Sequence, residues 1–409
     1  MRHEQHVQVR MLRREDLPAI YRWFRHPLVL RQTLQLPSLQ LGWMTRWFQD
    51  PQNTIQLVAE AIGGAGTGDV GPARVVGMVS LHRFSGRQDH VVGLGISVDP
   101  EYQGQGIGTG LMTAALDLAD RYWRPVRVEL DVYPDNEVAL RLYRRFGFEE
   151  EGRRLHHVIR DGAYVDTVVM SRIRWQGAAP GSTSDPQAHS AASRRTSDLE
   201  RQAMAPGGAI GPEGEAMAPG GAAALEVRPP APGDAAGLVR LYCDPELMRN
   251  SLLLPFPPPD EKKIAGELES FPPAPVHVFV ALWRGEVCGE VRLVPWRSRL
   301  SRGAEITLLV PPPGSPLAVA LGFPPDGVVR ALLGAALNLA DHWLLLHRLQ
   351  LDTYADEAWV FPVLQELGFL QEARRRLAVL RDGVFSDRLV WGRLDAGRAG
   401  FARGCGEDT

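Results

Sequence analysis

The clearest pattern of apolar and polar positions in the chain lies near residue 100. Residues 94–98 form a short apolar run, which predicts a β-strand. The apolar positions that follow recur at the spacing of a helix and are Ile107, Leu111, Ala114, Ala115 and Leu118. The pattern therefore predicts a strand followed by an amphipathic helix, with a short loop between them.

The loop between these two elements is rich in glycine. Its residues are Gln103, Gly104, Gln105, Gly106, Ile107 and Gly108. A helix N-terminus carries unpaired N–H groups and the positive end of the helix dipole, and glycine lets the backbone approach a ligand closely. The loop therefore predicts an anion site suited to a pyrophosphate. A tight turn that binds nothing has the same local sequence, so the neighbouring segments must decide.

A second strand and helix follow the first pair. Residues 128–132 predict a strand, Asn136 can cap a helix, and Tyr143 lies on the apolar face of that helix. Gly147 closes the helix, because glycine readily adopts positive φ there. The Asp-Gly pair at 161–162, between alternating apolar runs, predicts a hairpin turn.

Together these segments resemble the acetyl-CoA-binding signature of the GCN5-related N-acetyltransferases, the GNAT superfamily. The resemblance extends over residues 7–173, and its finer likeness is to a bacterial group of L-amino-acid N-acetyltransferases. It implies an α/β (α+β) fold in which helices flank a central mixed, mostly antiparallel sheet. It also implies that acetyl passes directly from acetyl-CoA to an amine, without an acyl-enzyme intermediate. The absence of cysteine from residues 1–173 agrees with that route.

The same resemblance implies roles for individual residues. The backbone groups that would bond the pantetheine arm are those of Ile96, Ser97 and Val98. The amides of residues 103–108 would bind the pyrophosphate. Asn136 and Tyr143 are two helical turns apart and share a face, which would turn Asn136 to the pantetheine and Tyr143 to the sulfur. Tyr143 is thus the candidate acid for the departing thiolate, and a plain core aromatic is the alternative.

The residue that removes the proton from the amine is not evident from the sequence. His90, just before the apolar run 91–98, is the preferred candidate, and a surface histidine is the alternative. His82, Glu60 and Glu129 are further candidates by residue type, while the family often uses a water chain or a backbone carbonyl. No cluster of residues predicts a metal site.

An early apolar segment is the candidate acceptor pocket. Its residues are Trp43, Trp47 and Phe48, with Leu34, Leu36 and Pro37 before them. An aromatic stripe at helical spacing is also typical of a core. If it is a pocket, small amines with apolar side chains suit it better than polyamines, which would require a ring of carboxylates.

The chain contains the same pattern twice. The sequence at 114–120 recurs at 335–341 with one difference, Asp117 against Asn338, at a separation of 221 positions (335 − 114), and the same separation relates Gly147 to Gly368. At the position of the glycine-rich loop the second copy has residues 324–329, with two prolines and Asp326. Proline has no N–H to donate and the aspartate would repel a pyrophosphate, so the second copy is predicted to have lost the cofactor site.

These observations predict two tandem domains of GNAT type. They divide the chain into a catalytic domain at residues 1–175, a linker rich in Ala, Gly, Pro and Ser at 176–222, a degenerate domain at 223–396 and a disordered tail at 397–409. Because many members of the family dimerise, the tandem is predicted to be an intramolecular pseudo-dimer.

Composition narrows the classes of function. The net charge of −3 leaves no global basic surface, so nucleic acid is not an expected partner. The three cysteines are far apart, the N-terminus lacks an apolar leader, and the apolar stretch 331–346 is interrupted by polar residues. We therefore expect a cytoplasmic protein with no membrane partner.

The sequence thus predicts an acetyl-CoA-dependent N-acetyltransferase whose acceptor is a small amine, such as a free L-amino acid. Acetylation of a protein N-terminus or of an antibiotic amine is an alternative within the enzyme class. A regulatory protein that binds CoA without turnover is the alternative outside it.

Overall fold

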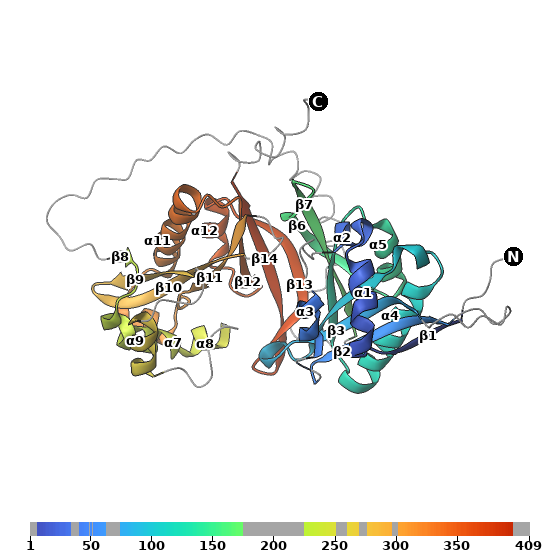
Figure 1. The fold of residues 1–409 in the computed structure, drawn as a ribbon. Coiled ribbons are helices and arrows are strands. Elements are labelled where there is room, and N and C mark those ends of the chain that lie inside the picture. The colour runs from blue at the N-terminus through green and yellow to red at the C-terminus, as the bar shows by residue number, and fades with distance from the viewer. Residues whose placement is uncertain are drawn as a thin grey trace, which may run out of the picture.

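The computed structural model describes residues 6–33, 41–48, 50, 52–62, 74–174, 225–250, 260–269, 276–296 and 302–395. Within these ranges the chain is a mixed α/β structure whose fourteen strands form one sheet (Figure 1). The predicted linker and tail, and the segment 34–37 of the candidate pocket, lie outside the described residues. We call residues 6–174 the N-terminal half and residues 225–395 the C-terminal half.

The N-terminal half contributes seven strands and five α-helices to the described structure. The strands are β1 (His6–Met11), β2 (Thr54–Ile62), β3 (Arg74–Arg83), β4 (Val91–Val98), β5 (Arg127–Val132), β6 (Glu149–Arg160) and β7 (Ala163–Ile173). The helices are α1 (Leu17–Phe24), α2 (Pro27–Arg31), α3 (Leu41–Met44), α4 (Ile107–Leu118) and α5 (Glu137–Arg145).

The C-terminal half has the same number of strands among its described residues. They are β8 (Leu225–Arg228), β9 (His277–Trp283), β10 (Glu286–Pro295), β11 (Gly303–Leu309), β12 (Arg348–Tyr354), β13 (Leu370–Arg381) and β14 (Val384–Leu394). Its helices are α7 (Ala235–Tyr242), α8 (Pro245–Asn250), α9 (Glu261–Glu269), α10 (Pro316–Leu321), α11 (Pro325–Asn338) and α12 (Phe361–Glu366).

The strand order is a palindrome in space. The sheet runs β1-β2-β3-β4-β5-β7-β6 and continues as β13-β14-β12-β11-β10-β9-β8. The pairs β4–β5 and β11–β12 are parallel and the rest are antiparallel, which agrees with the expected mixed, mostly antiparallel arrangement. We expected a separate sheet in each half, but β6 and β13 join the two at Gly152 and Ala373. The joint covers two strand edges that would otherwise be open.

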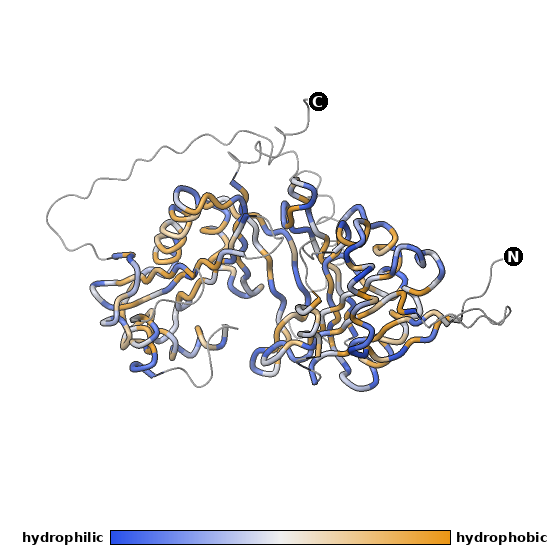
Figure 2. Tube along the Cα trace, viewed as in Figure 1, coloured by the Kyte–Doolittle hydropathy of each residue, from blue (hydrophilic) through white to orange (hydrophobic). Residues whose placement is uncertain are grey.

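Helices cover both faces of the sheet because the buried residues of its strands alternate. In β2, Leu57 and Ala59 pack toward α4 and α5, whereas Val58 packs toward α1 and α3. In the C-terminal half α11 and α12 occupy one face, and α7 and α9 the other. Figure 2 shows apolar positions along the central strands and the inward sides of these helices.

The predicted hairpin at residues 161–162 is confirmed. Val158 to Arg160 pair with residues 163–165, and both Asp161 (φ 53°) and Gly162 (φ 79°) have the positive φ of the turn that suits a right-twisted hairpin. The turn joins β7 to β6, the strand that meets β13 at Gly152.

Candidate active site

A fork between β4 and β5 is the centre of the site. The two strands pair only from Val91 to Gly93, opposite Arg127 to Glu129, and beyond that point they separate. On its other side β4 stays paired with β3 as far as Val98. The backbone of residues 94–98 therefore has one edge that β5 does not occupy, and an extended ligand can bond to such an edge as an added strand does.

The glycine-rich loop lies at the open end of the fork and begins α4, as predicted. Gly106 is the residue before the helix and has φ 82°, a backbone conformation that is unfavourable for residues with a Cβ. A Cβ at Gly104 or Gly106 would meet no atom within 4 Å, so this stretch of backbone is open to a ligand. The side-chain amide of Gln103 donates a hydrogen bond to the Val98 carbonyl (3.2 Å) and ties the loop to the end of β4.

A groove of about 1450 Å³ contains the fork and the loop. Of the predicted cofactor residues, those that line it are Ile96, Ser97, Val98, Gln103, Gly104, Gly106, Ile107, Gly108 and Asn136. Gln105 is not part of the wall, and its side-chain amide bonds the Glu101 carbonyl (3.4 Å). The loop, the free edge of β4 and the start of α5 therefore face one cavity, which is the arrangement that a long ligand with a pyrophosphate requires.

Asn136 and Tyr143 face the groove from α5. The side-chain oxygen of Asn136 accepts a hydrogen bond from the Ala139 backbone amide (3.2 Å), which caps the helix as predicted. Tyr143 is buried, with 6% of its surface exposed, and it packs against Phe148 while lining the groove. Burial raises the pKa of the Tyr143 hydroxyl, so the group stays protonated at neutral pH and keeps a proton to donate.

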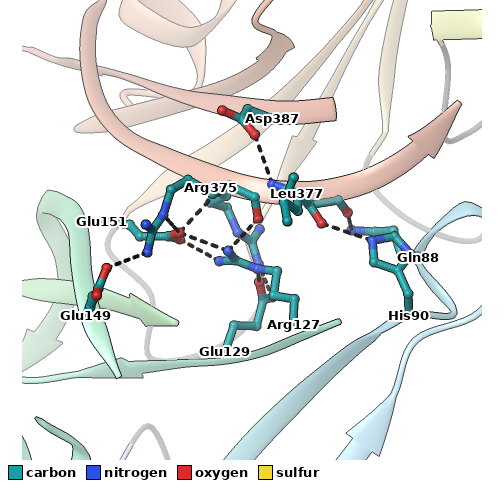
Figure 3. Close-up of polar contacts among 11 residues, drawn as sticks. Gln88, His90, Arg127, Glu129, Glu149, Glu151, Arg375, Leu377 and Asp387 are labelled. Carbon is teal, nitrogen blue, oxygen red and sulfur yellow. Dashed lines mark hydrogen bonds and ion pairs between the residues drawn. The ribbon is translucent and has the colours of Figure 1, made fainter. Parts of the chain in front are cut away.

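His90 lies at the boundary between the halves and not in the groove wall. Its Nε2 is 2.9 Å from the Leu377 carbonyl (Figure 3), and its ring packs against Phe385. Burial lowers the pKa of His90. The structure thus gives this histidine a structural contact with β13 and separates it from the predicted cofactor residues. Glu60, another candidate, is bound by Arg10 (2.8 Å) and is also outside the groove wall.

Other titratable side chains do line the groove. His82, at the end of β3, faces it, and partial burial lowers the pKa of this imidazole. Glu129 and Asp131 alternate along β5 and so share one face. Arg375 of β13 also lines the groove and pairs with Glu129, although it comes from the other half of the chain.

Apolar residues that the sequence did not single out also line the groove. They are Phe24, Leu28, Val29 and Phe84. Leu28 and Phe84 are exposed, which is expected for apolar residues that face a groove. Phe48, by contrast, packs on the cluster around α1 and α3, with the Arg14 guanidinium over its ring, so it belongs to the core.

The C-terminal half has a much smaller cavity at the matching place, about 140 Å³. Helix α11 begins with Pro325 after Pro324, and Asp326 lies in its first turn. Glu357 occupies the position of Asn136, and its burial raises the carboxyl pKa to about 7. Phe323, which follows the additional helix α10, is buried in the core cluster that also contains Val310 and Val360 of the cavity wall.

Two further features concern the described residues alone. No helix among them combines the length and the apolar character needed to span a membrane. No group of three His, Cys, Asp or Glu side chains within these ranges is placed to hold a metal ion.

Comparison with known proteins finds a family model and relatives that each match part of this chain. A family model described as Acetyltransferase (GNAT) family matches residues 17–148. The L-amino acid N-acetyltransferase AaaT of Escherichia coli (strain K12) is 30% identical over 169 residues, which are 41% of this chain and 98% of that protein. Spermidine N(1)-acetyltransferase of the same strain is 27% identical over 184 residues, 43% of this chain and 93% of that protein.

Solved structures match over a similar length. One is yncA, described as a putative acetyltransferase from Salmonella typhimurium with its cofactor acetyl-CoA. It is 20% identical, covers 43% of this chain and 98% of its own, and has a TM-score of 0.37.

Proposed function

This chain belongs to the acetyltransferase (GNAT) family, and from that premise we propose that residues 1–175 transfer acetyl from acetyl-CoA to the amine of a small molecule. The observation that carries the proposal is the single groove in which the glycine-rich loop, the free edge of β4, Asn136 and Tyr143 meet. An L-amino acid is the favoured acceptor, because Phe24, Leu28, Val29 and Phe84 give the groove apolar walls that suit an apolar side chain.

The residues present fit acetyl-CoA. The open amides of the loop at the start of α4 would hold the pyrophosphate, and the free edge of β4 at residues 96–98 would hold the pantetheine. When bound, acetyl-CoA supplies the thioester. A bond then forms between the amine nitrogen and the acetyl carbon, the carbon–sulfur bond breaks, the amine loses a proton and the sulfur gains one.

We assign these two protons to groove residues. Tyr143, protonated at neutral pH, is the proposed donor to the thiolate. His82 replaces His90 as the proposed acceptor of the amine proton, because it lines the groove and its lowered pKa keeps it neutral near pH 7. His90 contacts β13 instead.

We propose that residues 223–396 form a second domain of the same type that does not bind acetyl-CoA, within an intramolecular pseudo-dimer. The palindromic strand order supports a common architecture. The loss of the loop glycines, the buried Glu357 and the cavity of about 140 Å³ support the loss of the cofactor site, since ligand pockets are typically about 300 Å³ or more.

Two measurements test the function. Thiol release from acetyl-CoA should accompany acetylation when purified protein receives L-amino acids, and silence with amino acids, polyamines and peptides alike would defeat the proposal. Calorimetric titration of acetyl-CoA into the full-length protein should give one site per chain. Two sites would refute the silent second domain.

A further inference from the structure

The two halves meet through contacts that occur in equivalent pairs. Arg127 and Arg348, which are 221 positions apart, are fully buried, and each binds a glutamate of its own half, Glu151 or Glu372. The carbonyls that they reach across the boundary are those of Arg376 (2.8 Å) and Leu155 (2.6 Å). Leu155 and Arg376 are themselves equivalent, so these contacts have pseudo-twofold symmetry.

One arginine pair breaks this symmetry. Arg154 and Arg375 are equivalent positions (375 − 154 = 221), yet the side chains of both lie against β5 of the N-terminal half. Arg154 donates to Asp131 of its own half (3.2 Å). Arg375 crosses the boundary and pairs with Glu129, as Figure 3 shows. The C-terminal half thus contributes a charged side chain to the groove of the N-terminal half.

The position of this ion pair is informative. Glu129 lies opposite Gly93, the last paired residue before β4 and β5 separate. The free edge of β4 leads from the glycine-rich loop to that point, and Glu129 itself lines the groove. A ligand that extends from the loop along residues 96–98 toward Gly93 therefore leads to Glu129.

We propose that Arg375 is a positioning residue that orients the Glu129 carboxylate toward the acceptor amine, so that the C-terminal half completes the acceptor site of the N-terminal half. The inference rests on the proposed function, because it places the acceptor amine at the fork. It gives a cofactor-free second domain a part in substrate binding.

The charges around Glu129 support this role. Burial by itself raises its carboxyl pKa, but Arg375 first, and then Arg127, hold that pKa below its ordinary value. Arg154 of β6 adds a smaller effect of the same sign. Glu129 acts in turn on His90, but burial lowers the pKa of His90, which is therefore neutral near pH 7. The positive charge of Arg375 offsets much of the effect of burial on the Glu129 carboxylate. Removing that charge should therefore raise the pKa of Glu129.

The kinetic test uses full-length Arg375→Gln and Arg375→Lys, with Arg376→Gln as the matched control. Arg376 also pairs across the boundary, with Glu149 and Glu151, but it does not line the groove. With L-phenylalanine and spermidine as acceptor probes, Arg375→Gln should raise the KM for the amine about tenfold or more, while kcat and acetyl-CoA affinity stay near wild type. Arg375→Lys should restore part of the loss, because it keeps the charge without the planar fork.

Two results would overturn the proposal: an unchanged KM in Arg375→Gln, or an equal rise in Arg376→Gln. A double variant adds a second criterion. If Arg375 acts through Glu129, then Arg375→Gln should add little to the KM of Glu129→Gln, whereas additive effects would show independent roles.

A pH titration that does not depend on enzyme activity tests whether Arg375 lowers the pKa of Glu129. Carbon-13 NMR of glutamate-labelled full-length protein, with Glu129→Gln to assign the signal, should show the Glu129 pKa rising in Arg375→Gln and staying in place in Arg376→Gln. An unmoved Glu129 pKa in Arg375→Gln would overturn the proposal. Failure of the wild type to bind acetyl-CoA or to acetylate any amine would instead refute the proposed function, and the NMR result would stand by itself.

Discussion

Gly106 is the residue on which cofactor binding should depend most sharply. Its φ of 82° is unfavourable for a residue with a Cβ, and an added side chain would extend into the loop where the pyrophosphate is proposed to bind. Gly106→Val should abolish acetyl-CoA binding in a calorimetric titration. Gly110→Ala is the control, since Gly110 lies inside α4 with no atom within 4 Å of an added Cβ. Unchanged affinity in Gly106→Val would mean that the loop does not hold the cofactor.

Tyr143 should matter for rate and not for cofactor affinity. A thiolate is a fair leaving group, since thiols ionise near pH ~8.5, so Tyr143→Phe should lower kcat roughly 10- to 100-fold without abolishing turnover. Tyr133→Phe is the control, because Tyr133 also lines the groove but its hydroxyl bonds the Thr33 carbonyl (3.4 Å). Equal kcat in wild type and Tyr143→Phe would assign Tyr143 to the core alone.

The sequence predicts the position of some site residues in the fold better than that of others. The glycine-rich loop, Asn136 and Tyr143 were predictable because their spacing on one strand, loop and helix fixes their common face. His90 was not, because a histidine beside a strand gives no sign that another segment, here Leu377, will cover it. Arg375 was hidden for the same reason: its equivalence to Arg154 follows from the repeat, but its crossing to β5 does not.

At the scale of elements, the β6–β7 pair should make stability depend on pH. His157 is buried on β6, with its Nδ1 2.8 Å from the Thr167 hydroxyl of β7. Burial, with smaller effects of Arg154 and Arg348, lowers its pKa to about 2. Below pH ~6.5 the His157 imidazole binds a proton in the unfolded chain but not in the folded chain. The free energy of unfolding therefore falls by about 1.4 kcal/mol for each pH unit as the pH drops.

His157→Asn should remove this dependence. Urea unfolding at several values from pH 7 to pH 5 should show the wild type losing more stability on acidification than the variant. Exposed His342→Asn is the control and should follow the wild type. Parallel pH profiles for the wild type and His157→Asn would contradict the assignment.

Elements were more predictable than their assembly. The strand at residues 94–98, the helix from Ile107 and the hairpin at 161–162 follow from local periodicity and turn chemistry, which act over a few residues. The continuous sheet does not follow from them, because β6 and β13 meet through residues that are far apart in the sequence, such as Gly152 and Ala373. Tertiary contacts of this kind leave no periodic signal.

At the scale of the whole molecule, the boundary suggests what the N-terminal half would do alone. Residues 1–175 would leave the edge of β6 open, with Arg127 and Glu151 no longer covered by β13. An uncovered strand edge and an arginine–glutamate pair that is buried in the intact chain both favour association of the fragment with another chain. A second copy offers the same groups, since Leu155 of one copy can accept from Arg127 of another, as it accepts from Arg348 in the intact chain.

We therefore expect the fragment 1–175 to form a homodimer through β6. Gly152 makes this joint feasible, because a Cβ there would come within 2.2 Å of the Glu372 carbonyl oxygen in the intact chain, and two glycines facing each other avoid that clash. Analytical ultracentrifugation should find a dimer, and Gly152→Val should convert it to monomer while Gly110→Ala leaves it intact. Arg154, which replaces Arg375 in the fragment dimer, could then approach Glu129 of the partner copy, so the dimer should retain acceptor binding that the monomeric Gly152→Val fragment lacks. A fragment that is monomeric and binds the acceptor with wild-type KM would show that the C-terminal half contributes nothing to the groove.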